Sequence, residues 1–204
     1  LPAAEHPTPQ SLDRLTHEYE LRDELDGAWA AKPVELVQNP TRTILVLEDF
    51  DGEPLTRLIG APREIGSFLA LAIQIAAALG KVHRRGLVHK DVKPATILVN
   101  RAGEVRFTGF GFASRRPRER QSPAPLESIA GTLAYMAPEQ ILGKGASGAA
   151  DVFSLGAVLA YAATRRPPFP GDSSASLLYK VVHEEPERGD PDGELRGELR
   201  SVAE

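Results

Sequence analysis

The run from residue 89 to residue 96, His-Lys-Asp-Val-Lys-Pro-Ala-Thr, places a carboxylate two residues before an ammonium group. A carboxylate such as that of Asp91 could accept a proton, and the ammonium group of Lys93 could stabilise negative charge beside it. By itself, an Asp-x-Lys pair in a loop is most often a solvated ion pair on the surface. The pair therefore carries weight only if other motifs of the same chemistry accompany it at suitable spacing.

Further motifs accompany the pair in a definite order. Residues 131–139 read Gly-Thr-Leu-Ala-Tyr-Met-Ala-Pro-Glu, and residues 151–156 read Asp-Val-Phe-Ser-Leu-Gly. Upstream, residues 45–48 read Leu-Val-Leu-Glu and residues 17–20 read His-Glu-Tyr-Glu. With the run at 83–99, these segments resemble the protein kinase catalytic domain, whose catalytic loop follows the pattern H-R-D-L-K-P-x-N.

The resemblance implies an α+β fold with two lobes, in which a small N-terminal lobe precedes a mostly helical larger lobe. It implies that Asp91 is the proton acceptor and Lys93 the cation beside the phosphoryl group. Leu47, Glu48 and Leu98 would contact ATP on its adenine side. The implied partners are ATP and a protein substrate or signalling partner, and Lys93 and Thr132 are of the serine/threonine kinase type.

Other positions would hold the site together without touching the reacting atoms. In the family, Asp151 holds loop backbone amides, the Thr132 hydroxyl bridges Asp91 and Lys93, and Glu139 pairs with an Arg further along the chain. Glu18 is the candidate for the ion-pairing glutamate of the regulatory helix. The structural and regulatory positions that the resemblance implies are Glu18, His89, Phe110, Gly111, Thr132, Glu139 and Asp151.

Several positions depart from the family pattern, and most of them are positions that contact the phosphates or the metal ions in the family. Thr96 stands where the family has a metal-binding Asn, and Gly109 stands where D-F-G has its magnesium-binding Asp. Lys90 replaces an Arg whose planar fork grips a phosphorylated activation loop, and a lysine is only a point charge. The Gly-rich loop and the strand Lys of the family are absent. We therefore predict weak ATP binding with little dependence on magnesium.

The chain is expected to be a fragment, truncated at both ends. It begins with Leu1, and its single methionine is Met136. The predicted parts are 1–50, a partial N-terminal lobe; 51–190, the larger lobe; and 191–204, a disordered or truncated tail. The combined motifs also resemble the N-terminal kinase-like domain of bacterial hybrid proteins in which an ATPase-type module and a sensor histidine kinase follow. A larger multidomain signalling protein is thus the expected context.

Composition excludes some classes of function. A formal net charge of −4 and a pI of 5.8 offer no electrostatic reason to bind nucleic acid or an anionic membrane. The absence of cysteine excludes disulfides, thiolate metal sites and cysteine nucleophiles. The longest apolar stretch, 68–79, is short for a bilayer span, so a cytoplasmic protein is expected.

Periodicity predicts the elements that would position these residues. Helices are expected over 11–25, 55–59, 64–83, 152–163 and 173–183, and strands over 34–37, 43–47, 97–99 and 105–107. Ser11 is the expected cap of the first helix. The second long helix should bury the apolar face Ile65, Phe68, Leu69, Ala72, Ile73, Ala76 and Leu79.

Three functions remain open on the sequence. The chain could be a serine/threonine kinase with an unusual metal arrangement, weak or inactive as an isolated chain. It could be a pseudokinase that keeps the fold as an interaction module. It could also be a nonfunctional fragment of a gene. Two altered metal positions argue against efficient transfer, whereas the retention of both Asp91 and Lys93 argues for it.

Overall fold

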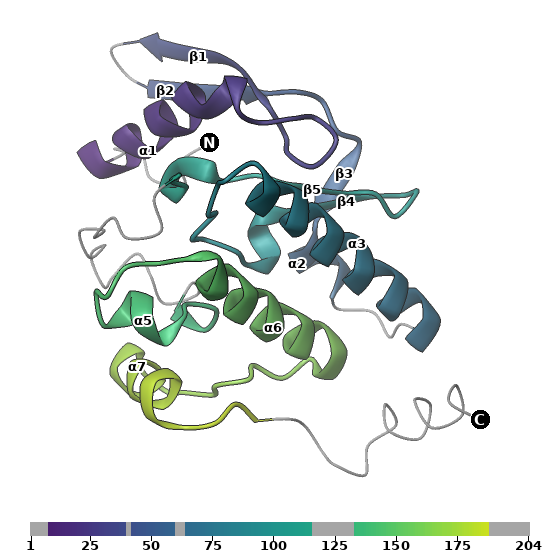
Figure 1. The fold of residues 1–204 in the computed structure, drawn as a ribbon, viewed down its shortest axis with the longest axis vertical. Coiled ribbons are helices and arrows are strands. Elements are labelled where there is room, and N and C mark those ends of the chain that lie inside the picture. The colour runs from purple at the N-terminus through teal and green to yellow at the C-terminus, as the bar shows by residue number, and fades with distance from the viewer. Residues whose placement is uncertain (1–7, 40–41, 60–63, 116–132, 188–204) are drawn as a thin grey trace.

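The computed structural model describes residues 8–39, 42–59, 64–115 and 133–187. In it, helices alternate with the strands of two small antiparallel sheets. Helix α1 (Pro9–Glu20) and strands β1 (Pro33–Asn39) and β2 (Arg42–Leu47) form one end of the molecule, and helices α6 (Gly148–Thr164) and α7 (Ser174–His183) form the other (Figure 1). Helix α3 (Ile65–Arg84) and the sheet of β3 (Gly52–Pro54), β4 (Ile97–Asn100) and β5 (Val105–Phe107) lie between them. This is the predicted α+β arrangement of a reduced small lobe and a larger helical lobe.

The N-terminal part is built from helix α1 (Pro9–Glu20), a 3₁₀ turn (Leu21–Asp23), and the hairpin of β1 (Pro33–Asn39) and β2 (Arg42–Leu47). The helix starts earlier than predicted. Its cap is Thr8, whose hydroxyl accepts from the amide of Ser11 at 3.2 Å, and Pro9 takes the first helical position, where a missing N–H costs nothing. The predicted Ser11 cap and the predicted extension to residue 25 were therefore wrong.

A second sheet carries the residues that follow the candidate catalytic pair. Strands β3 (Gly52–Pro54), β4 (Ile97–Asn100) and β5 (Val105–Phe107) run antiparallel in that order. The four-residue helix α2 (Leu55–Leu58) and the long helix α3 (Ile65–Arg84) come between β3 and β4 in sequence. β4 and β5 are buried through alternate residues, as a strand with one face on the core requires.

The buried face of α3 differs from the predicted one. The buried residues are Leu71, Ile75, Ala78, Leu79 and Val82. Ile73, predicted to be in the core, is 65% exposed, and Leu69 is 37% exposed. Helix α3 is apolar on most of its circumference, so its own periodicity does not determine which side is covered. Its contacts with β5 and with helix α6 determine that side.

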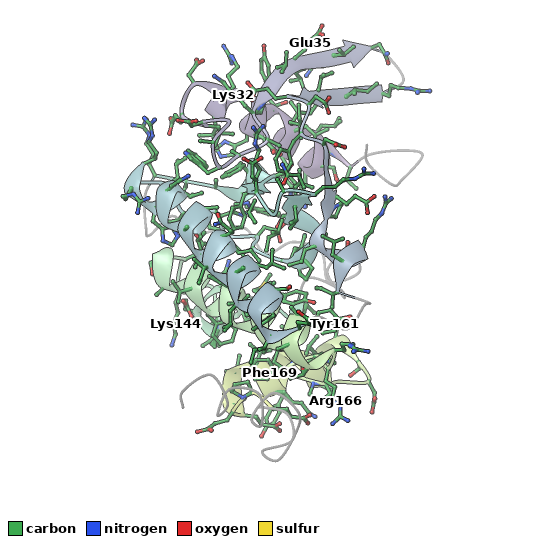
Figure 2. All side chains as sticks on the ribbon, turned by 90° about the vertical axis from the view of Figure 1, so that its right-hand side faces the viewer. Lys32, Glu35, Lys144, Tyr161, Arg166 and Phe169 are labelled. Atoms are coloured by element: carbon green, nitrogen blue, oxygen red, sulfur yellow. The ribbon has the colours of Figure 1, made fainter. Side chains whose placement is uncertain are left out.

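The C-terminal part contains α5 (Pro138–Ile141), α6 (Gly148–Thr164) and α7 (Ser174–His183). Ser147 and Ser173 cap α6 and α7 through their hydroxyls. Helix α7 begins next to its predicted start, whereas α6 begins at Gly148, before the predicted residue 152. A second core, formed by Leu133, Phe169, Leu177 and Val181, joins α7 to the segment before α5. Figure 2 shows Phe169 and Arg166 at this end of the molecule and Lys32 and Glu35 at the other.

Helix α3 also bears on the membrane prediction. Within the described residues it is long and apolar enough to cross a membrane, with a mean hydropathy of 1.8 over its best window. The expectation that no segment reaches that length was too strict. The criterion uses only length and composition, and core helices of soluble proteins satisfy it too, so no membrane span is established.

Candidate functional site

Asp91 and Lys93 lie together on the loop between α3 and β4. The ammonium group of Lys93 is 2.7 Å from Oδ2 of Asp91, and the side chains are 23% and 11% exposed respectively. The Asp91 amide donates to Nδ1 of His89 at 3.2 Å. The predicted pair is therefore a formed, partly buried ion pair whose carboxylate still reaches the surface.

Asp151, on the first turn of α6, anchors the loop that carries this pair. Its side chain is fully buried and accepts from the amides of His89 at 2.8 Å and Lys90 at 2.7 Å. His83, on the last turn of α3, contacts the same carboxylate at 2.9 Å. Lys90 has a positive φ of 68°, a conformation that costs a non-glycine residue energy. The buried carboxylate holds the loop in this strained shape.

His89 and Phe110 connect the loop to the core below it. Since Nδ1 of His89 accepts a hydrogen bond, Nε2 carries the proton and donates to the carbonyl of Thr108 at 3.1 Å. The rings of His89 and Phe110 lie 4.6 Å apart, and neither residue is exposed. Trp29 packs edge-on against Phe110 at 6.0 Å. His89 is thus a packed structural residue, as the resemblance implied.

Glu18 reaches from α1 to the segment that begins at Gly109. Its Oε1 accepts from the Gly109 amide at 2.9 Å, and its carboxylate also accepts from the amide of Phe110. Burial raises the pKa of Glu18 above its usual value, and these two hydrogen bonds partly offset that effect. Glu18 makes no ion pair with any residue that the structure describes. Its contact with Gly109 positions α1 against the site.

The two altered metal positions touch each other. The Thr96 hydroxyl lies 2.8 Å from the carbonyl of Asp91 and 3.1 Å from that of Lys93, and it accepts from the Lys93 amide at 3.2 Å. Gly109 has a left-handed backbone with φ 81°, and a Cβ built there would lie 2.9 Å from Cγ2 of Thr96. The oxygen of Thr96 is therefore committed to the backbone, and Gly109 offers no ligand.

A magnesium ion does not fit the residues present. Mg²⁺ binds through carboxylates and other oxygen ligands in near-octahedral geometry. In the part of the chain that the structure describes, no group of three His, Asp or Glu residues could hold a metal. Asp91 is already paired with Lys93 at 2.7 Å, and Glu18 accepts from the amide of Gly109.

Comparison with known proteins decides the family. The protein kinase domain matches residues 3–193 of the 204. The chain belongs to the protein kinase family.

Its similarity extends to bacterial serine/threonine kinases. The chain is 37% identical over 180 residues to the DNA damage-responsive serine/threonine-protein kinase RqkA of Deinococcus radiodurans, which is 86% of this chain and 25% of that protein. It is 39% identical over 153 residues to PknA of Mycobacterium tuberculosis, and this match covers 72% of this chain and 34% of that protein. It is 34% identical over 155 residues to the probable serine/threonine-protein kinase SCO3848 of Streptomyces coelicolor, and this match covers 75% of this chain and 23% of that protein. The chain therefore spans between a fifth and about a third of these relatives.

The family implies ATP as a substrate, usually with magnesium. The residues predicted to contact the adenine lie at the end of β2 and on β4. Leu47 ends β2, and Glu48 follows it with its amide donating to the carbonyl of Lys32 at 2.7 Å. Leu98, half-buried on β4, pairs with Pro54 and Arg106 across the sheet. Their contacts with a nucleotide remain a prediction.

Two predicted residues of the kinase site gain no support. Thr132 lies outside the described residues. Glu139, on α5, makes no ion pair with any described residue. Its carbonyl accepts from the amide of Lys144 at 2.9 Å. A cavity of about 720 Å³ between α3 and the β4–β5 turn does not include Asp91 among its lining residues.

Sequence reasoning missed three residues of this kinase site. Gln140 donates to the carbonyl of Lys90 at 3.0 Å and accepts from the amide of Ala137, so it ties α5 to the catalytic loop. Tyr135 lies beside Asp91 across a small cavity, and burial raises its pKa to about 12. Arg14 places its guanidinium 4.1 Å from the centre of the Phe112 ring. Tyr135 falls within the motif at 131–139, whereas no local pattern marks Gln140 or Arg14, which approach these segments only through tertiary contacts.

Proposed function

We propose that this chain is a serine/threonine kinase domain that binds ATP weakly and, as an isolated chain, transfers its terminal phosphoryl group slowly. The observation that carries the proposal is the 2.7 Å pair of Asp91 and Lys93, held on a loop that Asp151 anchors. The misfit of a magnesium ion at Gly109 and Thr96 limits the rate. Phosphoryl transfer relies on charge neutralisation that metal ions normally supply.

The chemistry needs few groups. The hydroxyl oxygen of a substrate serine or threonine attacks the γ-phosphorus of ATP, and Asp91 accepts the hydroxyl proton. The bond from the γ-phosphorus to the β–γ bridging oxygen breaks, and ADP leaves. Lys93, already beside Asp91, offsets negative charge on the transferred group. Leu47, Glu48 and Leu98 are the proposed contacts to the adenine.

A second function, a pseudokinase interaction module in a larger cytoplasmic signalling protein, is favoured by a different observation. Gly109 and Thr96 fit each other closely, so the site is well packed without metal ligands. Such packing is expected where the fold is kept and the chemistry is lost. The two proposals differ in whether Asp91 is needed for any measured activity.

The test measures phosphate transfer from radiolabelled ATP to a general protein substrate. The variant is Asp91→Asn, and the matched control is Asp23→Asn. The side chain of Asp23 is 82% exposed, and Asp23 lies far from Asp91 in the sequence. Weak transfer by the parent and by the control, absent in Asp91→Asn, supports the kinase. Equal transfer by all three points to a contaminating kinase. ATP binding without transfer favours the pseudokinase, and neither activity favours a nonfunctional fragment.

A further inference from the structure

The peptide group that joins Lys90 to Asp91 is held at both of its polar atoms. Its N–H, which belongs to Asp91, donates to Nδ1 of His89 at 3.2 Å. Its carbonyl, which belongs to Lys90, accepts from Nε2 of Gln140 at 3.0 Å. A peptide plane bonded on both sides cannot rotate without losing two hydrogen bonds. The orientation of Asp91 therefore depends on Gln140 as well as on His89.

The two partners of this peptide group come from different parts of the chain. His89 belongs to the same loop as Asp91 and is fully buried. Gln140 belongs to α5 and directly follows the motif at 131–139. A shift of α5 would therefore act on Asp91 through the hydrogen bond of Gln140.

The side-chain amide of Gln140 can face only one way. Its Oε1 accepts from the amide of Ala137 at 3.1 Å, at the start of α5, and its Nε2 donates to the carbonyl of Lys90. The Ala137 amide is only a donor and the Lys90 carbonyl is only an acceptor, so the reversed amide would lose both bonds. Lys90 is 7% exposed and Ala137 is 0% exposed, so a bond lost here is poorly replaced by water.

The backbone of Lys90 makes this bond more important. Its φ of 68° lies in the left-handed region, which is unfavourable for a residue with a side chain. Such a conformation persists only where the surroundings fix it. Asp151 binds the Lys90 amide at 2.7 Å, and Gln140 binds its carbonyl at 3.0 Å. Together these two side chains fix the residue that precedes Asp91.

We propose that Gln140 is a positioning residue for phosphoryl transfer, which orients the Asp91 carboxylate by holding the Lys90 carbonyl and so couples it to α5. This proposal rests on the proposed function, because it assigns a role in the same reaction. Rotation of the peptide between residues 90 and 91 changes φ of Asp91 and turns its side chain relative to Lys93. A misplacement of about 1 Å at a reacting group can lower a rate roughly 100-fold.

The experiment uses the 204-residue chain and measures three quantities: the rate of phosphate transfer at saturating ATP, the KM for ATP, and the hydrogen exchange of the Asp91 amide by NMR. Gln140→Glu keeps an acceptor for the Ala137 amide, but at neutral pH it has no donor for the Lys90 carbonyl. It should lower the rate about 10- to 100-fold and leave KM unchanged. The Asp91 amide should exchange about 10-fold faster, as expected when one supporting hydrogen bond is lost.

Two further variants make the test specific. Gln140→Met loses both hydrogen bonds without adding a charge, so it keeps the test open if the charge of Gln140→Glu prevents folding. It should show the same losses as Gln140→Glu. Gln74→Glu is the matched control, because Gln74 is exposed on α3 and undergoes the same change of charge. It should behave as the parent in all three measurements.

The other outcomes are decisive in the same way. If Gln140→Glu transfers phosphate as fast as the parent, the proposal fails while the proposed function stands. If only Gln140→Met is slow, Gln140 acts as the cap of α5 and the proposal fails. A KM that rises as the rate falls would show that Gln140 only supports the fold. If the parent transfers no phosphate, the proposed function fails, and the exchange of the Asp91 amide decides alone: faster exchange in both Gln140 variants upholds the orienting contact, and unchanged exchange refutes it.

Discussion

A Cβ atom added to Gly109 would lie 2.9 Å from Cγ2 of Thr96, closer than real Cβ contacts come. These are the two positions at which the chain departs from the metal ligands of its family. Because a side chain at position 109 would meet Thr96, each position limits which residue the other can hold. Their effects on stability should therefore not add independently.

The first prediction is a double-mutant cycle on this contact. Gly109→Ala should destabilise the chain through its left-handed backbone, about 1–2 kcal/mol, and through the clash with Thr96, about 1–3 kcal/mol more. Thr96→Ser removes only Cγ2 and keeps the hydroxyl hydrogen bonds. In the Thr96→Ser background, Gly109→Ala should cost less. Urea unfolding of the four proteins measures the coupling.

Gly103→Ala is the matched control for this cycle. Gly103 has nearly the same backbone, with φ 79°, but nothing lies within 4 Å of its Cβ position. It should show the backbone cost alone, unaffected by Thr96→Ser. Equal costs at the two glycines, or a cycle without coupling, would mean that the site relaxes freely around Gly109. Gly109→Asp with Thr96→Asn would then be an easy route to a magnesium-dependent ATP site.

The second prediction concerns the buried anchor. Asp151→Ala should destabilise the chain by roughly 3–5 kcal/mol, because the amides of His89 and Lys90 lose their acceptor in a buried place. Thermal unfolding followed by circular dichroism measures this change, with Asp23→Ala as the exposed control. Asp151→Asn keeps one acceptor oxygen, so its melting temperature should lie between those of Asp151→Ala and Asp23→Ala. A melting temperature for Asp151→Ala close to that of the control would refute the anchoring role.

The third prediction is a pH dependence at Glu18. Since burial raises its native-state pKa, the folded chain binds this proton more tightly than the unfolded chain does. Stability is therefore lost as the pH rises from about 4.3, the usual glutamate value, through the raised pKa. Glu18→Gln removes the charge and keeps an acceptor for the Gly109 amide. Its melting temperature relative to the parent should rise with pH over this window.

Glu20→Gln is the control for that titration, because Glu20 is exposed on the same helix. Its melting temperature should follow the parent at every pH. A difference between Glu18→Gln and the parent that stays constant with pH would show that the buried carboxylate does not titrate in this range.

The fourth prediction concerns uneven stability along the chain. The hairpin of β1 and β2 is only two strands wide, and Val34 and Val46 on it are 58% and 39% exposed. Such a hairpin is marginal without further cover. Its amides should exchange with solvent faster than those of Ile75 and Leu79 in α3, which are almost wholly buried. Hydrogen-exchange mass spectrometry that finds uniform protection along the chain would contradict this prediction.

The sequence by itself determined the family, the order of most elements and the identity of the candidate pair. Local chemistry was enough for these, because a cap, a turn or a period of 3.6 residues is set by neighbours along the chain. Helices α3 and α7 begin and end within one residue of their predicted bounds, whereas α6 begins at Gly148 and not at the predicted residue 152. The spacing of known kinase motifs likewise placed Asp91, Lys93 and Asp151.

Only the tertiary structure decided which sides of these elements meet. Helix α3 is apolar nearly all round, so the choice to bury Leu71 and Ile75 and to expose Ile73 came from the shapes of β5 and α6. The contact of Gly109 with Thr96, and the place of Arg14 over Phe112, join segments far apart in the chain. No local rule predicts such contacts, because they depend on how whole elements pack and not on the propensity of any one residue.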